Sequence, residues 1–132
     1  MSLKYLGNKN ILVVEDDAFN AQLIRSLLRK ISDMNIITAH DGSEAIKILH
    51  SQEIIDMVLL DIRMPIMGGD EVLVYIRQNK AFENMPVLVV SVDKDNETRL
   101  REMGANDFIL KPFDINDLAS KISANFKYKK KA

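Results

Sequence analysis

The sequence contains no cysteine among its 132 residues. This absence excludes a disulfide framework and a thiolate metal site, and it is compatible with a reducing compartment. No apolar run approaches the roughly 20 residues that span a bilayer, so we expect no contact with the membrane interior. The start of the chain lacks the long apolar stretch of a secretory signal. We therefore expect a cytoplasmic protein.

The net charge is also small, at −1, because 18 basic residues nearly balance 19 acidic residues. Four of the basic residues lie within residues 127–132, so residues 1–126 carry 14 basic and 19 acidic residues, a net charge of −5. An acidic body of this kind does not predict direct binding to nucleic acid. The basic end is typical of a solvated helix end or the start of a linker, with nucleic acid or anionic lipid as the alternative contact.

Length and composition predict one domain with a real core, since 47% of the residues are hydrophobic and 28% are charged. We assign residues 1–9 to an N-terminal extension, residues 10–126 to the domain and residues 127–132 to a basic tail. Met1 to Leu3 could equally have been added during cloning.

Five short apolar runs alternate with amphipathic stretches. Continuous runs of this length are typical of strands that helices cover on both faces. The runs are residues 11–14, 36–39, 57–60, 87–90 and 108–110. Apolar residues between and after the runs recur at helical spacing, most weakly over residues 96–103. Asp114 is placed to cap the last helix.

This alternation predicts an α/β fold in which helices cover both faces of a five-stranded parallel sheet. Right-handed crossovers then give a doubly wound (βα)5 unit of the flavodoxin-like class. In such sheets the functional crevice lies at the carboxyl ends of the strands, beside the point where the strand order reverses.

Polar side chains after four of the five predicted strands are expected at one edge of the sheet, whereas His40 and Asp41 after the second strand lie farther out. Carboxylates that share one crevice resist ionisation unless a cation is present, and oxygen ligands alone suit Mg²⁺. A carboxylate at such a metal can attack phosphorus, while an ammonium group and a hydroxyl neutralise and bind the phosphoryl oxygens. The residues at these strand ends are Glu15, Asp16 and Asp17, then Asp61, then Ser91, and finally Lys111 with Pro112.

Seven segments around these positions carry a specific pattern in order and spacing. They are residues 11–17 (ILVVEDD), 41–45 (DGSEA), 57–65 (MVLLDIRMP), 67–69 (MGG), 87–91 (VLVVS), 104–105 (GA) and 107–113 (DFILKPF). In these segments the chain resembles a receiver domain of two-component response regulators, and it is similar to the single-domain chemotaxis-type regulator. The resemblance covers nearly the whole chain, from about Asn10 to Phe126.

The resemblance implies a phosphorelay function. Asp61 would accept a phosphoryl group from a phosphohistidine on a sensor histidine kinase or a histidine phosphotransfer protein. Asp16 and Asp61 would bind Mg²⁺, or Mn²⁺ in its place, through their carboxylates. Arg63 would contribute its backbone carbonyl, and Glu15 would act on the metal largely through water.

The resemblance also implies a conformational switch. Ser91 would be the switch hydroxyl, Lys111 would pair with the phosphoryl group, and Phe108 would be the aromatic residue that rotates. The bond before Pro112 would be cis, which is plausible only because proline follows. An output partner would bind the face made by the fourth helix, the fifth strand and the fifth helix, and the protein would catalyse only its own phosphorylation and dephosphorylation.

Several of these residues have plainer interpretations. Asp17 could serve as a helix cap as readily as a metal ligand. Phe108 lies in a short apolar strand, where such a residue is usually just core. His40 and His50 lie outside the predicted crevice, and we interpret both as surface residues.

Three residues at the rim of the crevice are expected to tune the rates. Val92 stands where the family often has a small residue, so its β-branched side chain would narrow the path to Asp61 and slow small phosphodonors. Arg63 and Asp93 could pair across the mouth, at ~0–1 kcal/mol for an exposed pair, and gate the access of water.

Three other functions would each require something different of the same residues. A flavin binder would need phosphate-cradling loops where the acidic residues 15–17 lie. A phosphohydrolase with an aspartyl-phosphate intermediate would want a carboxylate where Arg63 stands. A receiver-like interaction module that is never phosphorylated remains the alternative, although the joint presence of Asp16, Asp61 and Lys111 argues against it.

Overall fold

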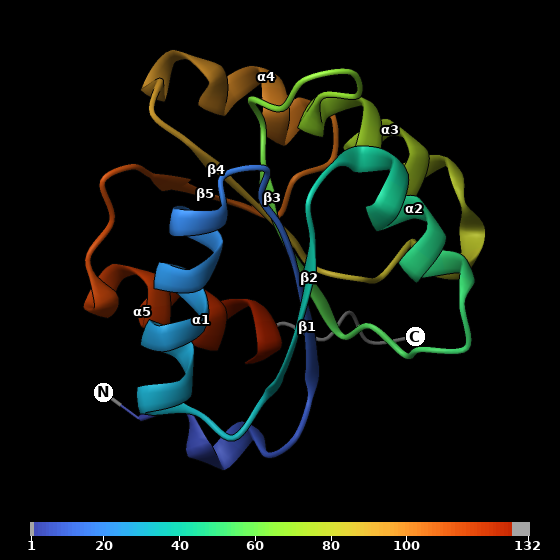
Figure 1. Cartoon of the computed structure of the whole chain (residues 1–132). Helices are drawn as coiled ribbons and strands as arrows, with labels where there is room; N and C mark the ends of the chain where they lie inside the picture. The colour runs from blue at the N-terminus through green and yellow to red at the C-terminus, as the bar shows by residue number, and fades with distance from the viewer. Residues whose placement is uncertain (1, 128–132) are drawn as a thin grey trace.

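The computed structural model describes residues 2–127, which form one five-stranded parallel sheet between two layers of helices (Figure 1). The strand order is β2-β1-β3-β4-β5, so the order reverses between β1 and β3. All five predicted runs are strands, each one residue longer than its apolar run. The strands are β1 (Asn10–Val14), β2 (Asn35–Ala39), β3 (Met57–Asp61), β4 (Val87–Ser91) and β5 (Asp107–Leu110). The predicted α/β fold is confirmed.

Five α-helices and three short 3-10 turns connect the strands. The helices are α1 (Ala18–Ile31), α2 (Gly42–His50), α3 (Gly69–Gln78), α4 (Glu97–Glu102) and α5 (Ile115–Lys127), and the turns are η1 (Lys4–Leu6), η2 (Lys80–Phe82) and η3 (Lys94–Asn96). The predicted fourth helix, over residues 96–103, is α4, and η3 precedes it. The Asp93 carboxylate accepts from the Asp95 N–H at the start of this 3-10 turn. None of the helices within residues 2–127 has the length and apolar character needed to cross a membrane.

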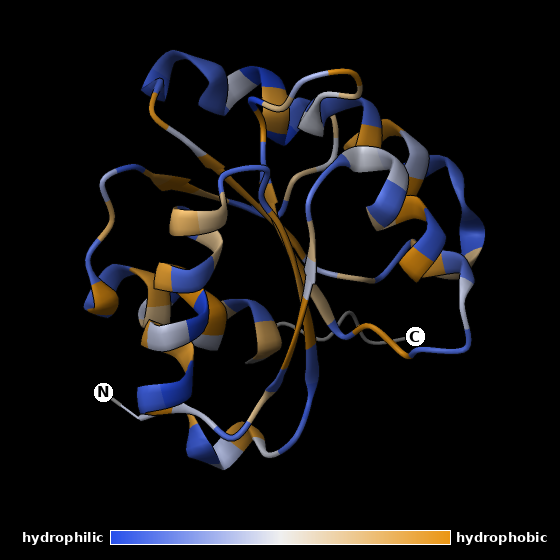
Figure 2. Ribbon diagram, in the orientation of Figure 1, coloured by the Kyte–Doolittle hydropathy of each residue, from blue (hydrophilic) through white to orange (hydrophobic). Residues whose placement is uncertain are grey.

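The strands are apolar at successive positions because each face of the sheet has its own core. In β1, Leu12 and Val14 pack with α2, α3 and α4, whereas Ile11 and Val13 pack with α1 and α5. Successive side chains of a strand point to opposite faces, so both sets must be apolar. Figure 2 shows the central strands as the most hydrophobic part of the chain. Polar residues are thereby confined to the strand ends and the loops.

Aspartate side chains fix where three of the helices begin. Asp17 accepts from the N–H groups of Phe19 and Asn20 at the start of α1, so the structure gives it the capping role. Asp41 accepts from the Glu44 N–H at the start of α2. Asp114 caps α5 as predicted, accepting from the Asp117 N–H. Each bond satisfies one of the backbone donors that a helix leaves free at its N-terminus.

The N-terminal extension is partly core. Leu3 is fully buried with the side chains of α1 and α5, and its N–H donates to the Ile31 carbonyl at 2.6 Å. Leu3 therefore packs as a residue of the fold, which the interpretation of Met1 to Leu3 as added residues did not foresee. At the other end, Lys127 closes α5, and residues 128–132 of the predicted basic tail lie outside the described residues.

Replacing Leu3 with alanine should lower the free energy of unfolding by about 2–3 kcal/mol, because it leaves a cavity between α1 and α5. Urea denaturation followed by circular dichroism measures the change. Leu23→Ala is the matched control, since Leu23 is 42% exposed. An equal loss in both variants would contradict a core role for Leu3.

Candidate functional site

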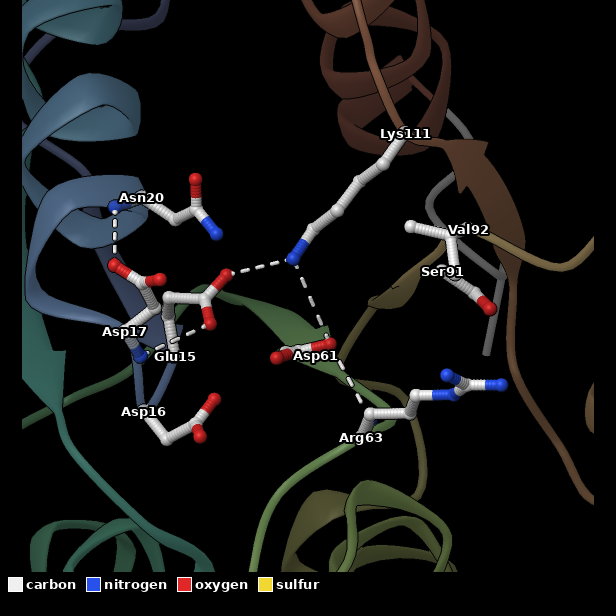
Figure 3. Close-up of a pocket in the computed structure, with 9 residues that line it drawn as sticks. All are labelled: Glu15, Asp16, Asp17, Asn20, Asp61, Arg63, Ser91, Val92 and Lys111. Atoms are coloured by element: carbon white, nitrogen blue, oxygen red, sulfur yellow. Dashed lines mark hydrogen bonds and ion pairs between the residues drawn. The ribbon is translucent and has the colours of Figure 1, made fainter.

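A pocket opens at the carboxyl edge of the sheet, beside the reversal of strand order. Its volume is about 270 Å³, below the usual size of a site for an organic cofactor. A small ionic group fits better than a flavin. The pocket is lined by Glu15, Asp16, Asp17, Asn20, Asp61, Arg63, Ser91, Val92 and Lys111 (Figure 3).

The fold therefore brings together most of the predicted residues from four strand ends. Asn20 is an addition that the sequence reasoning missed. It lies three residues after the Asp17 cap, in the first turn of α1, and that spacing was the available signal. Phe108 and Asp93 do not line the pocket.

Three carboxylates converge in the pocket. Oxygen atoms of Glu15, Asp16 and Asp61 all lie within 4.8 Å of one another. Glu15 and Asp61 are buried, whereas Asp16 is exposed at the mouth. Oxygen ligands on one wall and an open side toward water match what Mg²⁺ requires, because it keeps several waters when bound. The donor set therefore fits a hard divalent cation.

Lys111 places a positive charge between two of these carboxylates. Its Nζ lies 2.9 Å from Glu15 Oε1 and 3.7 Å from Asp61 Oδ1. The Asp17 N–H also donates to Glu15, at 3.3 Å, and holds that side chain in place. The bond between Lys111 and Pro112 is cis, as predicted. Lys111 thus offsets part of the negative charge, but one ammonium cannot balance three carboxylates.

Burial and a neighbouring carboxyl group both act on Asp61. Burial, the larger cause, and the nearby Glu15 carboxyl raise its pKa from 3.8 to about 7. The charge of Lys111 and the Arg63 N–H, which donates to Asp61 Oδ1 at 3.3 Å, lower the pKa and oppose this shift only in part. Without a bound cation, Asp61 is therefore half protonated near neutral pH.

The two predicted switch residues occupy different places. Ser91 is buried in the pocket wall, and its Oγ accepts from the Asp93 N–H at 3.1 Å. Phe108 is buried in the core under α4, where it packs with Leu100 and Ala105. In this structure Phe108 is a core residue, and its rotation stays a prediction.

The rim is only partly as expected. Val92 is 56% exposed and lines the mouth of the pocket. The Arg63 side chain runs away from Asp61 (Figure 3), and within residues 2–127 it forms no ion pair with Asp93. The expected pair is not formed because the Asp93 carboxylate caps η3 instead. The effects of these three residues on rates stay predictions.

The sequence profile of the response regulator receiver domain matches residues 11–123. The chain belongs to this family. The receiver domain is 32% identical to the chemotaxis protein CheY of Pseudomonas aeruginosa, over 88% of this chain and 94% of that protein. It is 35% identical to the autoinducer sensor kinase/phosphatase CqsS of Vibrio cholerae, but there it spans only 17% of the relative's length.

Solved structures agree with this assignment. The response regulator TrrA of Thermotoga maritima, solved in complex with Mg²⁺ and BeF, is 29% identical and superposes with a TM-score of 0.80, covering 89% of this chain and 98% of that one. The receiver domain thus belongs to two-component signalling, and its acidic cluster lies where a metal can bind.

Replacing Asp61 with asparagine should stabilise the metal-free receiver domain at pH 8. Above pH 3.8 the unfolded chain loses the Asp61 proton, whereas the folded chain keeps it until about pH 7. Stability contributed by this group is therefore lost as the pH rises through that window. We expect a gain on the order of 1–3 kcal/mol at pH 8 that shrinks toward pH 5.

Urea denaturation in the presence of a chelator measures this gain. Asp33→Asn is the control, since Asp33 is an exposed carboxylate outside the pocket. A gain that does not vary with pH would contradict the burial of an ionisable Asp61.

Proposed function

We propose that this receiver domain is a switch controlled by phosphorylation of Asp61. The observation that carries the proposal is the position of Asp61, buried at the base of a pocket beside two further carboxylates, with the Lys111 ammonium between it and Glu15. A nucleophilic carboxylate, a cation site and a fixed ammonium are the three parts that phosphoryl transfer requires.

The donor is a phosphohistidine on a sensor histidine kinase or a histidine phosphotransfer protein. An Asp61 oxygen attacks phosphorus, the P–N bond breaks, and the imidazole nitrogen keeps the electron pair. The product is an acyl phosphate on Asp61. Hydrolysis later breaks the new P–O bond and restores the carboxylate, so the protein acts only on its own phosphoryl group and is not an enzyme for other substrates.

The acidic cluster holds Mg²⁺, with Mn²⁺ as a substitute. Asp16 and Asp61 would bind it through carboxylates, Arg63 through its backbone carbonyl, and Glu15 largely through water. When bound, the metal keeps Asp61 ionised and supplies positive charge to the phosphoryl oxygens. Lys111, already 3.7 Å from Asp61, pairs with the phosphoryl group on the other side.

The switch begins at Ser91. Its hydroxyl gives up the Asp93 N–H and donates to a phosphoryl oxygen, which draws the loop after β4 inward. The loop carries η3 and α4 with it, and Phe108 turns in behind Ser91. The face of α4, β5 and α5 changes as a result, and an output partner reads that face. We place this exchange in the cytoplasm, with no direct contact to nucleic acid.

Incubation with phosphoramidate and Mg²⁺ should add one phosphoryl mass to the protein, in a bond that is stable to acid and labile to base. Intact-mass spectrometry detects the adduct. It should be absent from Asp61→Asn and from wild type treated with a chelator, and present in Asp33→Asn. An adduct that persists in Asp61→Asn would overturn the proposal.

Val92→Ala should accelerate labelling by phosphoramidate, because it removes two methyl groups from the mouth of the pocket. We expect about a two- to fivefold increase, equivalent to a barrier ~0.4–1 kcal/mol lower. The initial rate of adduct formation measures it. Val74→Ala is the control, since Val74 is a half-exposed valine on α3 that does not line the pocket. An unchanged or slower rate in Val92→Ala would sink the steric explanation.

A further inference from the structure

The side chain of Arg77, in the last turn of α3, ties that helix to two other segments of the chain. Two of its hydrogen bonds go to the loop between α4 and β5, and two go to the residues that precede β4. The acceptors are the Gly104 carbonyl at 2.8 Å, Asn106 Oδ1 at 2.7 Å, the Phe82 carbonyl at 3.1 Å and the Met85 carbonyl at 2.9 Å. Arginine suits this role because its planar group holds several N–H donors in fixed directions. The loop after α4 is therefore bonded to α3.

Two residues of this loop fit the contact with Arg77. Gly104 has a φ of +110°, which side chains rarely adopt, and a Cβ there would lie 2.7 Å from Arg77 Cγ. Asn106 bonds to Val87 in both directions, since its N–H donates to the Val87 carbonyl at 2.9 Å and its Oδ1 accepts from the Val87 N–H at 2.8 Å. Residues 104–106, which we call the clamped loop, are thus fixed to both α3 and β4.

The other end of α4 has far fewer contacts with the rest of the protein. The N–H and the carboxylate of Asp93 both bond within the loop that leads into the helix. In the described part of the chain, residues 92–99 make one polar contact outside residues 91–103, the ion pair of Arg99 with Asp70 at 3.7 Å. Both side chains are exposed, and such a pair contributes about 0–1 kcal/mol. The first turn of α4 can therefore move at a lower cost than the clamped loop.

The core contact of α4 favours a rotation about the clamped loop over a shift of the whole helix. Leu100 is the one buried residue of α4, and it packs in the core under the helix. It lies four positions before Gly104, or about 6 Å along the axis. A rotation about the clamped loop moves Leu100 less than it moves the first turn, whereas a translation moves both equally. The rotation therefore disturbs the core less for the same movement of the first turn.

We propose that α4 is a lever that rotates about the clamped loop, and that Arg77 holds the pivot. The first turn of α4 then changes position, while Arg101 and Asp107, paired at 2.9 Å beside the pivot, stay in place. A partner that contacts only this second part binds both states, and one that reaches the first turn distinguishes them. The trigger at Ser91 rests on the proposed function. The pivot does not, because its contacts are present before any phosphoryl group is bound.

Pairs of spin labels measure the rotation, and the absence of cysteine from the chain makes two introduced cysteines the only labelled sites. One label replaces Thr98 or Glu102, exposed residues near the two ends of α4, and the other replaces Lys30 on α1 or Lys47 on α2. Thr98 and Glu102 lie about 9 Å and about 3 Å from Gly104 along the axis. When Mg²⁺ and phosphoramidate are added, double electron–electron resonance should show a displacement at Thr98 about threefold that at Glu102. Equal displacements would overturn the lever.

Arg77→Lys keeps the positive charge but loses the planar group, so it cannot hold all four acceptors. The clamped loop should then move with the helix, and the ratio of the two displacements should fall from about three toward one. Arg29→Lys is the matched control, because Arg29 is an exposed arginine on α1, and it should keep the wild-type ratio. A ratio that stays at about three in Arg77→Lys would refute the role of Arg77.

Hydrogen exchange followed by NMR tests the pivot without phosphorylation. The N–H groups of Asn96 and Asn106 both donate to backbone carbonyls, of Asp93 at 3.2 Å and of Val87 at 2.9 Å. In wild type the Asn106 amide should exchange about tenfold more slowly than the Asn96 amide, and Arg77→Lys should remove that difference by accelerating Asn106 alone. Equal exchange of the two amides in wild type, or an unchanged Asn106 in Arg77→Lys, would contradict the pivot.

The two experiments separate this inference from the proposed function. Failure of phosphoramidate to label wild type would refute the phosphorylation of Asp61, and hydrogen exchange would still decide the pivot. Labelling of wild type with equal displacements at the two ends of α4 would refute the lever alone.

Discussion

The position of one ammonium group among three carboxylates is the constraint on which the site depends. Lys111 lies between Glu15 and Asp61, side chains that come from the ends of β5, β1 and β3. Its charge keeps the acidic pocket compatible with a folded chain, yet it leaves a net negative charge at Asp61. That remainder suits the pocket to a divalent cation. The chemistry at Asp61 therefore follows from an imbalance that the fold maintains.

The sheet confines the charged residues of the site to the ends of the strands. Apolar side chains fill both faces of the strands, so charged residues are excluded from most of the sheet and gather where the strands end. The reversal of strand order between β1 and β3 places two acidic strand ends side by side. Gly69 completes the arrangement, because a Cβ there would lie 2.2 Å from the Asp61 carbonyl oxygen. Only glycine lets α3 begin this close to Asp61.

The helices around the pocket differ in how many of their residues are buried. α4 has six residues and buries only Leu100, whereas α3 buries Gly69, Val72, Leu73 and Ile76. An element with few buried contacts moves at low cost in free energy. α4 follows the loop that begins at Ser91, so the least anchored helix adjoins the proposed switch hydroxyl.

The sequence by itself determined the five strands, the five helices and the polar strand ends, because burial on two faces and the helical repeat leave direct signals in the order of residues. It also determined the Asp114 cap, which depends on local chemistry, whereas the cis bond before Pro112 was implied by the resemblance to the family. Only the tertiary structure decided which distant groups meet. Leu3 enters the core, Asn20 reaches the pocket, and Asp93 caps η3 instead of meeting Arg63, since each outcome depends on which groups the assembled fold brings within reach. The tertiary structure also decides the raised pKa of Asp61, because burial and the approach of Glu15 exist only once the strands are assembled.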